Sequence, residues 1–417
     1  MNNSPALARR LGTFDASLIG LGSMIGAGVF AAFTPAAAAA GSGLLIGLVM
    51  AAFVAFCNAT SSAQLAARYP TSGGTYVYGR ERLGPWAGFL AGWGFIIGKT
   101  ASAAAMAMTF AAYAAPQGWE RPVAIAAVVL LTAVNYHGVT RTAGLTRVLV
   151  IVVLAALAIA VTAVWGGSGP DFSDFAGEGL LAEGWYGILQ SAGLLFFAFA
   201  GYARIATMGE EVREPKRTIP RAIGIALGIT ILIYAVIAVT LLAALGPEGV
   251  AATPTPLADA VGAGTLAWAS PLVRVGAAVA SLGALLALVA GLGRTSLAMA
   301  REHDLPHWLS AVHPKYKVPH RAEVTLAVVI CLIIAVADLR GAIGFSSFGV
   351  LLYYLVANVA AYTQPGEDRR YPKFLQVTGA VACVVLVATL PPLSAGLGVL
   401  MFVVGIAYRV IRLRVSP

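Results

Sequence analysis

The hydrophobic positions of this 417-residue chain form long runs that are separated by short polar links. A run of about 20 apolar residues is long enough to cross a bilayer as a helix. Windows of that length predict twelve membrane spans, and hence an all-α membrane protein. Their approximate ranges are 14–40, 43–66, 85–115, 121–137, 143–165, 185–208, 221–246, 271–300, 322–338, 343–362, 373–390 and 394–411.

The first predicted span contains Gly20, Gly22, Gly26 and Gly28 within nine residues. Each glycine costs about 1 kcal/mol relative to alanine in a helix interior. Non-helical backbone survives in hydrocarbon only where protein buries it or where it lines a cavity. The pattern therefore predicts a broken helix with a binding site near the membrane midplane, where freed N–H groups hold an anion. A GxxxG helix-packing face is the alternative, since Gly22 and Gly26 have that spacing.

The sixth span repeats this feature, because Gly201 lies within it and the chain turns polar soon afterwards, at 209–215. Interrupted first and sixth spans are typical of two five-helix inverted repeats with a binding site at their interface. The predicted divisions are a transport core over 1–362, repeats of about 14–165 and 185–362, and two peripheral helices within 363–417.

Basic residues are distributed unevenly between the links. With the N-terminus inside, Arg121, Arg274 and Arg340 lie outside and Lys99 lies within a span, while the other 23 of the 27 lysines and arginines lie on the cytoplasmic side. This positive-inside pattern predicts cytoplasmic N- and C-termini. It also accounts for the net charge of +9, so we expect a lipid bilayer around the chain and no nucleic-acid partner.

Candidate chemistry outside the first and sixth spans is sparse. Cys57, Cys331 and Cys383 all lie in apolar runs, which argues against a disulfide framework. His303 and His307 are four residues apart, but Pro306 lies between them and no further ligands cluster nearby. We therefore expect neither a metal site nor a cofactor.

Lys99 is the one charge predicted near the centre of a span. All 18 acidic residues are assigned to the two membrane surfaces, so Lys99 has no evident acidic partner. A charge at that depth costs about 2.5–3.5 kcal/mol on insertion scales. The ammonium could remain charged beside carbonyls and water, meet an anionic group of a substrate, or lose its proton on burial. The structural alternative is a side chain that snorkels to the surface. The lack of a mid-membrane acid also argues against a membrane-embedded enzyme.

Several segments in order carry a resemblance to a known family. They are 22–30, 197–202, 210–215 and 298–301, the last followed by Leu305-Pro306. On these segments the chain resembles the amino acid–polyamine–organocation transporter superfamily. The resemblance covers spans one to ten and implies ten core helices in two inverted repeats, two peripheral helices and alternating access.

The resemblance also implies a substrate site made largely of backbone. The α-carboxylate of an amino acid would meet N–H groups at Gly26, Ala27 and Gly28, and Phe197 would form an aromatic gate. The α-ammonium would meet carbonyls near Ser23 and Met24 and at Phe197, Ala198 and Ala200. The predicted substrate-binding set is Ser23, Met24, Ile25, Gly26, Ala27, Gly28, Lys99, Phe197, Ala198, Ala200 and Gly201.

Two positions depart from the family pattern. Many relatives carry serine or threonine at Ala27, and several carry a lysine that stands in for sodium at the position matching Val153.

Span three borders the side-chain end of the site in this family. Lys99 would therefore repel cationic substrates and serve as the coupling residue.

These observations predict a secondary transporter of amino acids in the cell membrane. Neutral or acidic substrates are favoured over cationic ones, and transport is proton-coupled or an exchange. The alternatives are a transporter of the same fold for another small metabolite or an ion such as potassium, and a nutrient receptor that does not transport.

Overall fold

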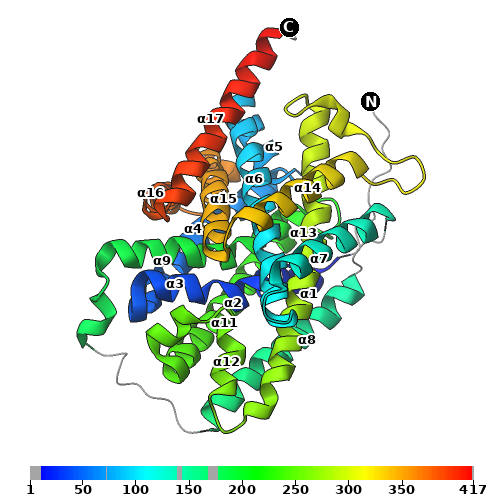
Figure 1. Ribbon diagram of the computed structural model, residues 1–417. Helices are drawn as coiled ribbons and strands as arrows, with labels where there is room; N and C mark the ends of the chain where they lie inside the picture. The colour runs from blue at the N-terminus through cyan, green and yellow to red at the C-terminus, as the bar shows by residue number, and fades with distance from the viewer. Residues whose placement is uncertain (1–10, 72, 139–142, 168–176, 416–417) are drawn as a thin grey trace.

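The computed structural model describes residues 11–71, 73–138, 143–167 and 177–415, and their regular structure is helical (Figure 1). Apolar runs in a chain with few charges form helices because a helix satisfies its own backbone hydrogen bonds inside a membrane. The α-helices are α1 (Thr13–Met24), α2 (Ala27–Ala31), α3 (Phe33–Ala40), α4 (Leu44–Arg68), α5 (Gly74–Leu83), α6 (Pro85–Ala114), α7 (Glu120–Tyr136), α8 (Ala143–Trp165), α9 (Gly184–Phe199), α10 (Ala203–Ala206), α11 (Pro215–Ala252), α12 (Pro256–Gly262), α13 (Ser270–Arg301), α14 (His320–Val336), α15 (Leu339–Tyr362), α16 (Lys373–Thr389) and α17 (Pro392–Val415). The 3-10 turns are η1 (Gly41–Gly43), η3 (Gly177–Leu181), η4 (Ala200–Tyr202), η5 (Ala267–Ala269), η6 (His307–Ser310) and η7 (Gly366–Asp368).

Each of the twelve predicted spans coincides with helix. Fewer than twelve of the described helical segments, however, are long enough to cross a membrane. Within the described ranges, nine helical segments are sufficiently long and apolar. The predicted spans 121–137, 322–338 and 373–390 correspond to α7, α14 and α16, which have 17 residues each. At 1.5 Å per residue such a helix covers about 25 Å of a hydrocarbon core about 30 Å thick. The length criterion thus supports nine spans rather than the predicted twelve.

The link 67–84, between the second and third predicted spans, contains the ten-residue helix α5. The predicted external acidic link 166–184 includes Asp171 and Asp174, which lie outside the described residues. The end of α17 and the link between α13 and α14 lie toward the top of the view in Figure 1, and the sequence predicts that both are on the cytoplasmic side.

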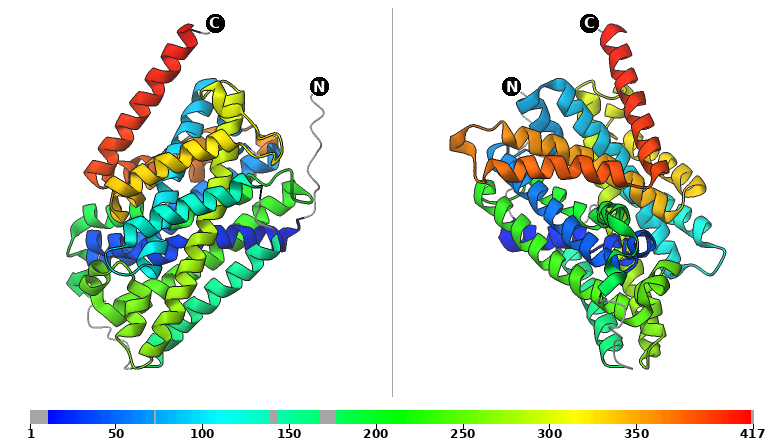
Figure 2. Two further views of the ribbon diagram at one scale, coloured as in Figure 1. Left: turned by 45° about the vertical axis from the view of Figure 1, so that its right-hand side comes forward. Right: turned by 90° about the vertical axis from the view of Figure 1, so that its left-hand side faces the viewer.

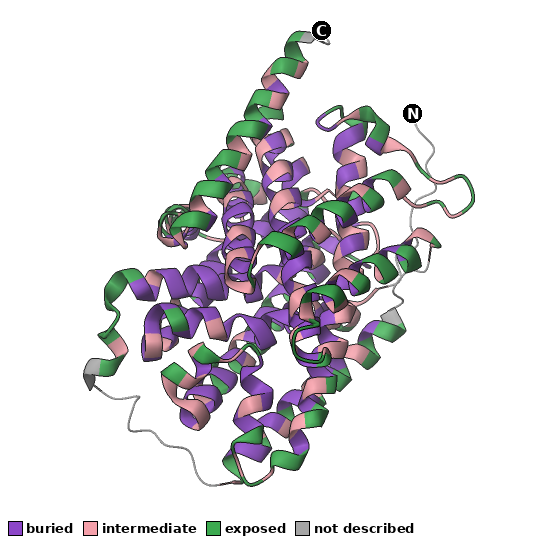
Figure 3. Cartoon of the chain, viewed as in Figure 1, coloured by how far each residue is buried: buried purple, intermediate pink, exposed green. Residues whose placement is uncertain are grey.

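The buried core runs through the middle of the bundle, with exposed faces at its periphery (Figure 3). α6 packs against α13 and α15, while α4 packs against α9 and α11. The first-span segments α1 to α3 lie within this core and pack against α8, α9 and α11. The fold therefore buries both interrupted spans among other helices.

The last helix, α17, extends from the bundle and is exposed along much of its length (Figure 2). Its Arg409 is nevertheless 7% exposed and forms an ion pair with the buried Asp304. The guanidinium also lies over the rings of Trp86 and Phe89, at 4.9 and 4.7 Å from their centroids. A helix predicted to be peripheral is thus anchored to α6 and to the end of α13.

Candidate functional site

The first predicted span is interrupted at Ile25 and Gly26. α1 ends at Met24, and the Ile25 N–H still donates to the Leu21 carbonyl at 2.8 Å. Gly26 then has φ −63° and ψ −125°, which is not helical, and α2 starts at Ala27. The first N–H groups of a helix have no preceding carbonyl within it. The break therefore presents backbone donors at its α2 side.

The interruption in the sixth span takes a different form. α9 ends at Phe199 and continues as the 3-10 turn η4 and the four-residue helix α10. Ala200 has φ −65° and ψ 1°, so the backbone tightens instead of opening. The sequence predicted two similar breaks, whereas the structure has one open break and one 3-10 turn.

Glycines allow the two interrupted spans to touch through their backbones. A Cβ added at Gly201 would lie 2.3 Å from the Ser23 carbonyl oxygen. One added at Gly28 would lie 2.7 Å from the Ala198 Cα. Both distances are shorter than real Cβ atoms adopt, so each glycine permits an approach that alanine would prevent.

The hydroxyl of Tyr234 lies between the two spans and was missed by sequence reasoning. This buried residue of α11 places Oη 2.7 Å from the Met24 carbonyl oxygen and 3.0 Å from the Ala198 carbonyl oxygen. The sequence predicted that these carbonyls face an ammonium group. A tyrosine inside an apolar span was the available signal, since a buried hydroxyl needs a polar partner.

Lys99 extends from α6 to the sixth-span turn. Its side chain is 8% exposed, and Nζ donates to the Ala200 carbonyl at 3.3 Å. The Tyr354 hydroxyl also donates to that carbonyl, at 3.5 Å. The lysine thus points into the protein and does not snorkel to the surface.

The remaining predicted site residues lie in the same buried region. The Ser23 hydroxyl donates to the Ile19 carbonyl at 2.8 Å, within its own helix. Phe197 is 7% exposed and belongs to the core cluster that contains Met24, Ile25 and Tyr234. The sequence-predicted residues are therefore brought together, although protein side chains already contact several of the carbonyls.

A cavity of about 10 Å³ borders the first break. It is as large as a single water molecule requires. Val153, at the position where several relatives carry lysine, is among its lining residues, which are Gly22, Gly26, Leu149, Val150, Val153 and Ala280. An amino acid would need more space, so binding requires the helices to move apart.

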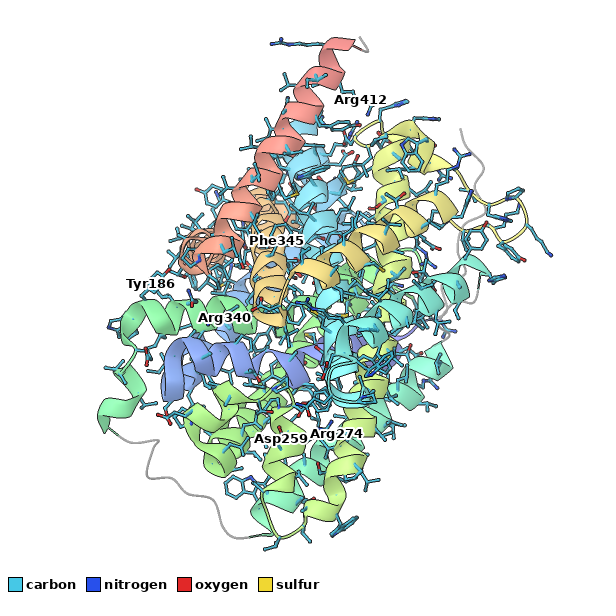
Figure 4. All side chains as sticks on the ribbon, in the orientation of Figure 1. Tyr186, Asp259, Arg274, Arg340, Phe345 and Arg412 are labelled. Atoms are coloured by element: carbon cyan, nitrogen blue, oxygen red, sulfur yellow. The ribbon has the colours of Figure 1, made fainter. Side chains whose placement is uncertain are left out.

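Hydrogen bonds link α6 to α2 and α13 on the predicted external side of the site. The Tyr113 hydroxyl donates to the Phe30 carbonyl at 3.3 Å, and Arg274 donates to the Tyr113 carbonyl at 3.3 Å. Asp259 and Arg274 lie near one another there (Figure 4), and Thr255 contacts both side chains.

Contacts on the predicted cytoplasmic side also hold the first span in place. Asp15 of α1 forms an ion pair with Arg147 of α8. The Leu11 N–H donates to the Glu211 carbonyl at 3.1 Å, and the Arg213 N–H donates to the Leu11 carbonyl at 2.9 Å. The structure therefore has contacts on both sides of the junction between the interrupted spans.

Candidate metal ligands do not cluster in the described part of the chain. No group of three histidine, cysteine, aspartate or glutamate side chains gathers there to hold an ion. His303 and His307 instead stack their rings, with centroids 5.6 Å apart.

Comparisons with known proteins give this geometry a context. A model of the amino acid permease family matches residues 11–410. An uncharacterized transporter of Mycobacterium tuberculosis (strain ATCC 25618 / H37Rv) is 57% identical over 401 residues, which cover 96% of this chain and 90% of that protein. The branched-chain amino acid permease BcaP of Bacillus subtilis (strain 168) is 25% identical over 399 residues, covering 90% and 84%. The methylthioribose transporter of the same organism is 29% identical over 395 residues, covering 87% and 80%.

Proposed function

This chain belongs to the amino acid permease family, a family of transporters and not of enzymes, and from that premise we propose that it moves amino acids across the cell membrane by alternating access. The family match extends over nearly the whole chain, and the helices are those of a multi-pass membrane protein. The proposed core comprises two inverted repeats within 1–362, and both termini face the cytoplasm.

The junction of the two interrupted spans is the observation that carries this proposal. A zwitterion needs hydrogen-bond donors at one end and acceptors at the other. The N–H groups of Gly26, Ala27 and Gly28 would hold its carboxylate at the start of α2, where the helix dipole favours an anion. Carbonyls of Met24 and Ala198 would hold its ammonium. Ile25 and Gly201 shape the two sides.

The carbonyls of this junction are occupied by the protein itself before substrate arrives. Tyr234 contacts Met24 and Ala198, and Lys99 contacts Ala200. Substrate binding then exchanges these internal contacts for contacts to the ammonium, while the ring of Phe197 covers the substrate. Such an exchange ties substrate binding to movement of α6 and α11 relative to the interrupted spans.

Lys99 is the proposed selectivity and coupling residue. Its ammonium lies within the membrane-spanning part of α6 and close to the proposed site. A fixed positive charge disfavours cationic side chains by Coulomb repulsion, and the low dielectric strengthens that effect. Neutral or acidic amino acids are therefore the proposed substrates. Proton uptake or release at Lys99 would couple transport to a proton gradient; exchange without net proton movement is the other mode.

Another small metabolite is the second candidate substrate class. The observation that favours it is the 29% identity to a methylthioribose transporter. A sugar derivative has no ammonium group, so it would leave Lys99 and Tyr234 on their carbonyls.

Radiolabelled uptake into proteoliposomes tests the proposal. The panel contains leucine, glutamate, arginine and methylthioribose, each with and without an imposed pH gradient. We expect saturable uptake of leucine or glutamate and weak uptake of arginine. Uptake of methylthioribose alone would select the second candidate. Substrate binding without flux in any vesicle would identify a receptor and overturn the transport proposal.

A further inference from the structure

Glu323 is a buried carboxylate that the proposed substrate site does not use. It lies in the first turn of α14, and the residue is 2% exposed. Among the described residues, its Oε2 atom has no hydrogen-bond partner. A buried ionised carboxylate is costly without full hydrogen bonding, and a bound proton removes that cost.

The neighbouring helix α13 provides space and one charge for this carboxylate. A Cβ at Gly293 would lie 2.7 Å from Glu323 Cγ and 3.2 Å from Oε1, so the side chain fits only because residue 293 is glycine. Arg294 follows directly, is exposed, and lies close enough for its charge to act on Glu323. The guanidinium favours the ionised carboxylate, while burial favours the protonated one.

His320 connects this carboxylate to the link that precedes α14. It lies three residues before Glu323, and side chains at that spacing share one face of a helix. Its Nδ1 atom is buried and has no hydrogen-bond partner within the described structure. The ring contacts those of His313 and Tyr136, with centroids 5.3 and 6.0 Å away. His320 is the first residue of α14, so along the chain it lies between the predicted cytoplasmic link and Glu323.

Several titratable groups on the helices that pack against α14 contact residues other than Glu323. α14 packs against α6, α7, α13 and η6. On α6, Lys99 donates a hydrogen bond to Ala200 and Tyr113 donates one to Phe30. At the end of α7, Tyr136 and His137 contact the Tyr316 ring. On η6, the His307 ring stacks on that of His303. Arg294 of α13 is therefore the charged group that acts on Glu323, while Arg301 of α13 and Arg321 of α14 are exposed.

Arg294 connects this carboxylate to the sixth-span interruption. Its charge acts against that of Arg204, which belongs to α10, directly after η4. Arg204 also lies 4.0 Å from the Glu211 carboxylate. Neutralising Glu323 leaves Arg294 with less compensation, which increases its repulsion of Arg204.

We propose that Glu323 is a proton-binding site near the predicted cytoplasmic side, whose protonation leaves the charge of Arg294 free to act on Arg204 of α10. The carboxylate takes up one proton to become the acid and releases it to the same side. This inference rests on the proposed transport function and adds a second proton-binding group to Lys99. Lys99 acts at the substrate site, and Glu323 acts at the predicted cytoplasmic end.

Infrared difference spectroscopy tests the protonation directly, without any transported substrate. Wild-type protein in lipid should show a carboxylic-acid C=O band that titrates with pH, and Glu323→Gln should lack it. The matched control is Glu302→Gln, since the Glu302 side chain is 54% exposed and pairs with Arg80 at 3.2 Å. Loss of the band in the control alone, or an unchanged band in Glu323→Gln, would overturn the proposal.

A second variant keeps the test valid if Glu323→Gln does not fold. Arg294→Gln leaves the buried carboxylate in place and removes the cation, so the band should titrate at higher pH than in wild type; an unchanged midpoint would contradict the proposed role of Arg294. In vesicles, substrate exchange by wild type should vary at least fivefold with the pH on the predicted cytoplasmic side, whereas exchange by Glu323→Gln should vary less than twofold. Absence of any flux in wild type would overturn the transport function and leave the infrared result to stand.

Discussion

The two interrupted spans solve the same structural problem in different ways. The first opens its backbone at Gly26, so that a new helix starts at Ala27 with unsatisfied donors. The sixth keeps its backbone nearly helical through η4 and presents carbonyls. Those carbonyls contact side chains from other helices, Tyr234 on α11 and Lys99 on α6.

In the proposed substrate site, this difference would separate two roles. The donor side is built from local sequence, because glycines interrupt the helix where they stand. The acceptor side is completed by distant residues, and its occupancy changes when those residues move. We infer that the first span fixes where a carboxylate binds and that the sixth span, with α6 and α11, responds to the rest of the substrate.

The largest expected effect comes from filling the first break. Gly28→Leu would place a side chain against Ala198, where even a Cβ would be 2.7 Å from Cα. Overpacking of about 3 kcal/mol corresponds to a loss of about 100-fold in binding. Scintillation proximity binding with labelled substrate measures this. Gly224→Leu is the control, since nothing lies within 4 Å of a Cβ there. Wild-type affinity in a folded Gly28→Leu protein would place the substrate away from this break.

A smaller change at the sixth span tests whether its contact with the first span matters. Gly201→Ala adds one methyl group directed at the Ser23 carbonyl. We expect a cost of about 1–2 kcal/mol, seen as a lower melting temperature and an approximately tenfold lower transport rate. Gly228→Ala, which has open space around it, serves as the matched variant. Equal behaviour of the two variants would show that the spans do not need this close contact.

Removing the charge on the acceptor side tests its proposed role in coupling. Lys99→Met keeps the length of the side chain and abolishes the contact of Nζ with Ala200. The pH dependence of uptake should flatten to less than about twofold across the tested range, and uptake of arginine should rise, because the fixed charge is gone. Uptake is measured against pH in matched vesicles. Parallel pH curves for the two proteins would assign Lys99 a structural role.

The smallest expected effect comes from removing one hydroxyl. Tyr234→Phe keeps the ring and leaves the carbonyls of Met24 and Ala198 without this donor. A hydrogen bond of about 0.5–1.5 kcal/mol predicts a change of about two- to tenfold in substrate affinity. We expect affinity to rise, because the substrate ammonium no longer has to displace the hydroxyl; a fall in affinity would show that the hydroxyl only braces the site. Tyr362→Phe, at a residue that is 43% exposed, should change neither affinity nor stability. An unchanged affinity in Tyr234→Phe would remove this hydroxyl from the binding event.

Much of the architecture could be predicted from the pattern of hydrophobic positions. Helix occurs in all twelve predicted ranges, and the first break lies within the cluster of glycines from Gly20 to Gly28. The resemblance to the transporter superfamily is confirmed by the family match. The predicted ranges for α7, α14 and α16 match these helices in length to within one residue, so the sequence already indicated that these three spans are short for a bilayer.

The chain by itself determined the membrane environment, the helical class and the position of the first interruption, because composition and glycine content act locally on each segment. Tertiary structure decided which groups meet at that interruption. Lys99 and Tyr234 are separated by more than a hundred residues, and their two contacts to the sixth-span carbonyls exist only because the fold brings these side chains of α6 and α11 to that span. Glu323 is a further example. The sequence places this acid at a membrane surface, whereas the structure buries it, because Gly293 leaves room for its side chain. Burial and hydrogen-bond partners depend on neighbours that are distant in sequence, and periodicity along one helix does not encode them.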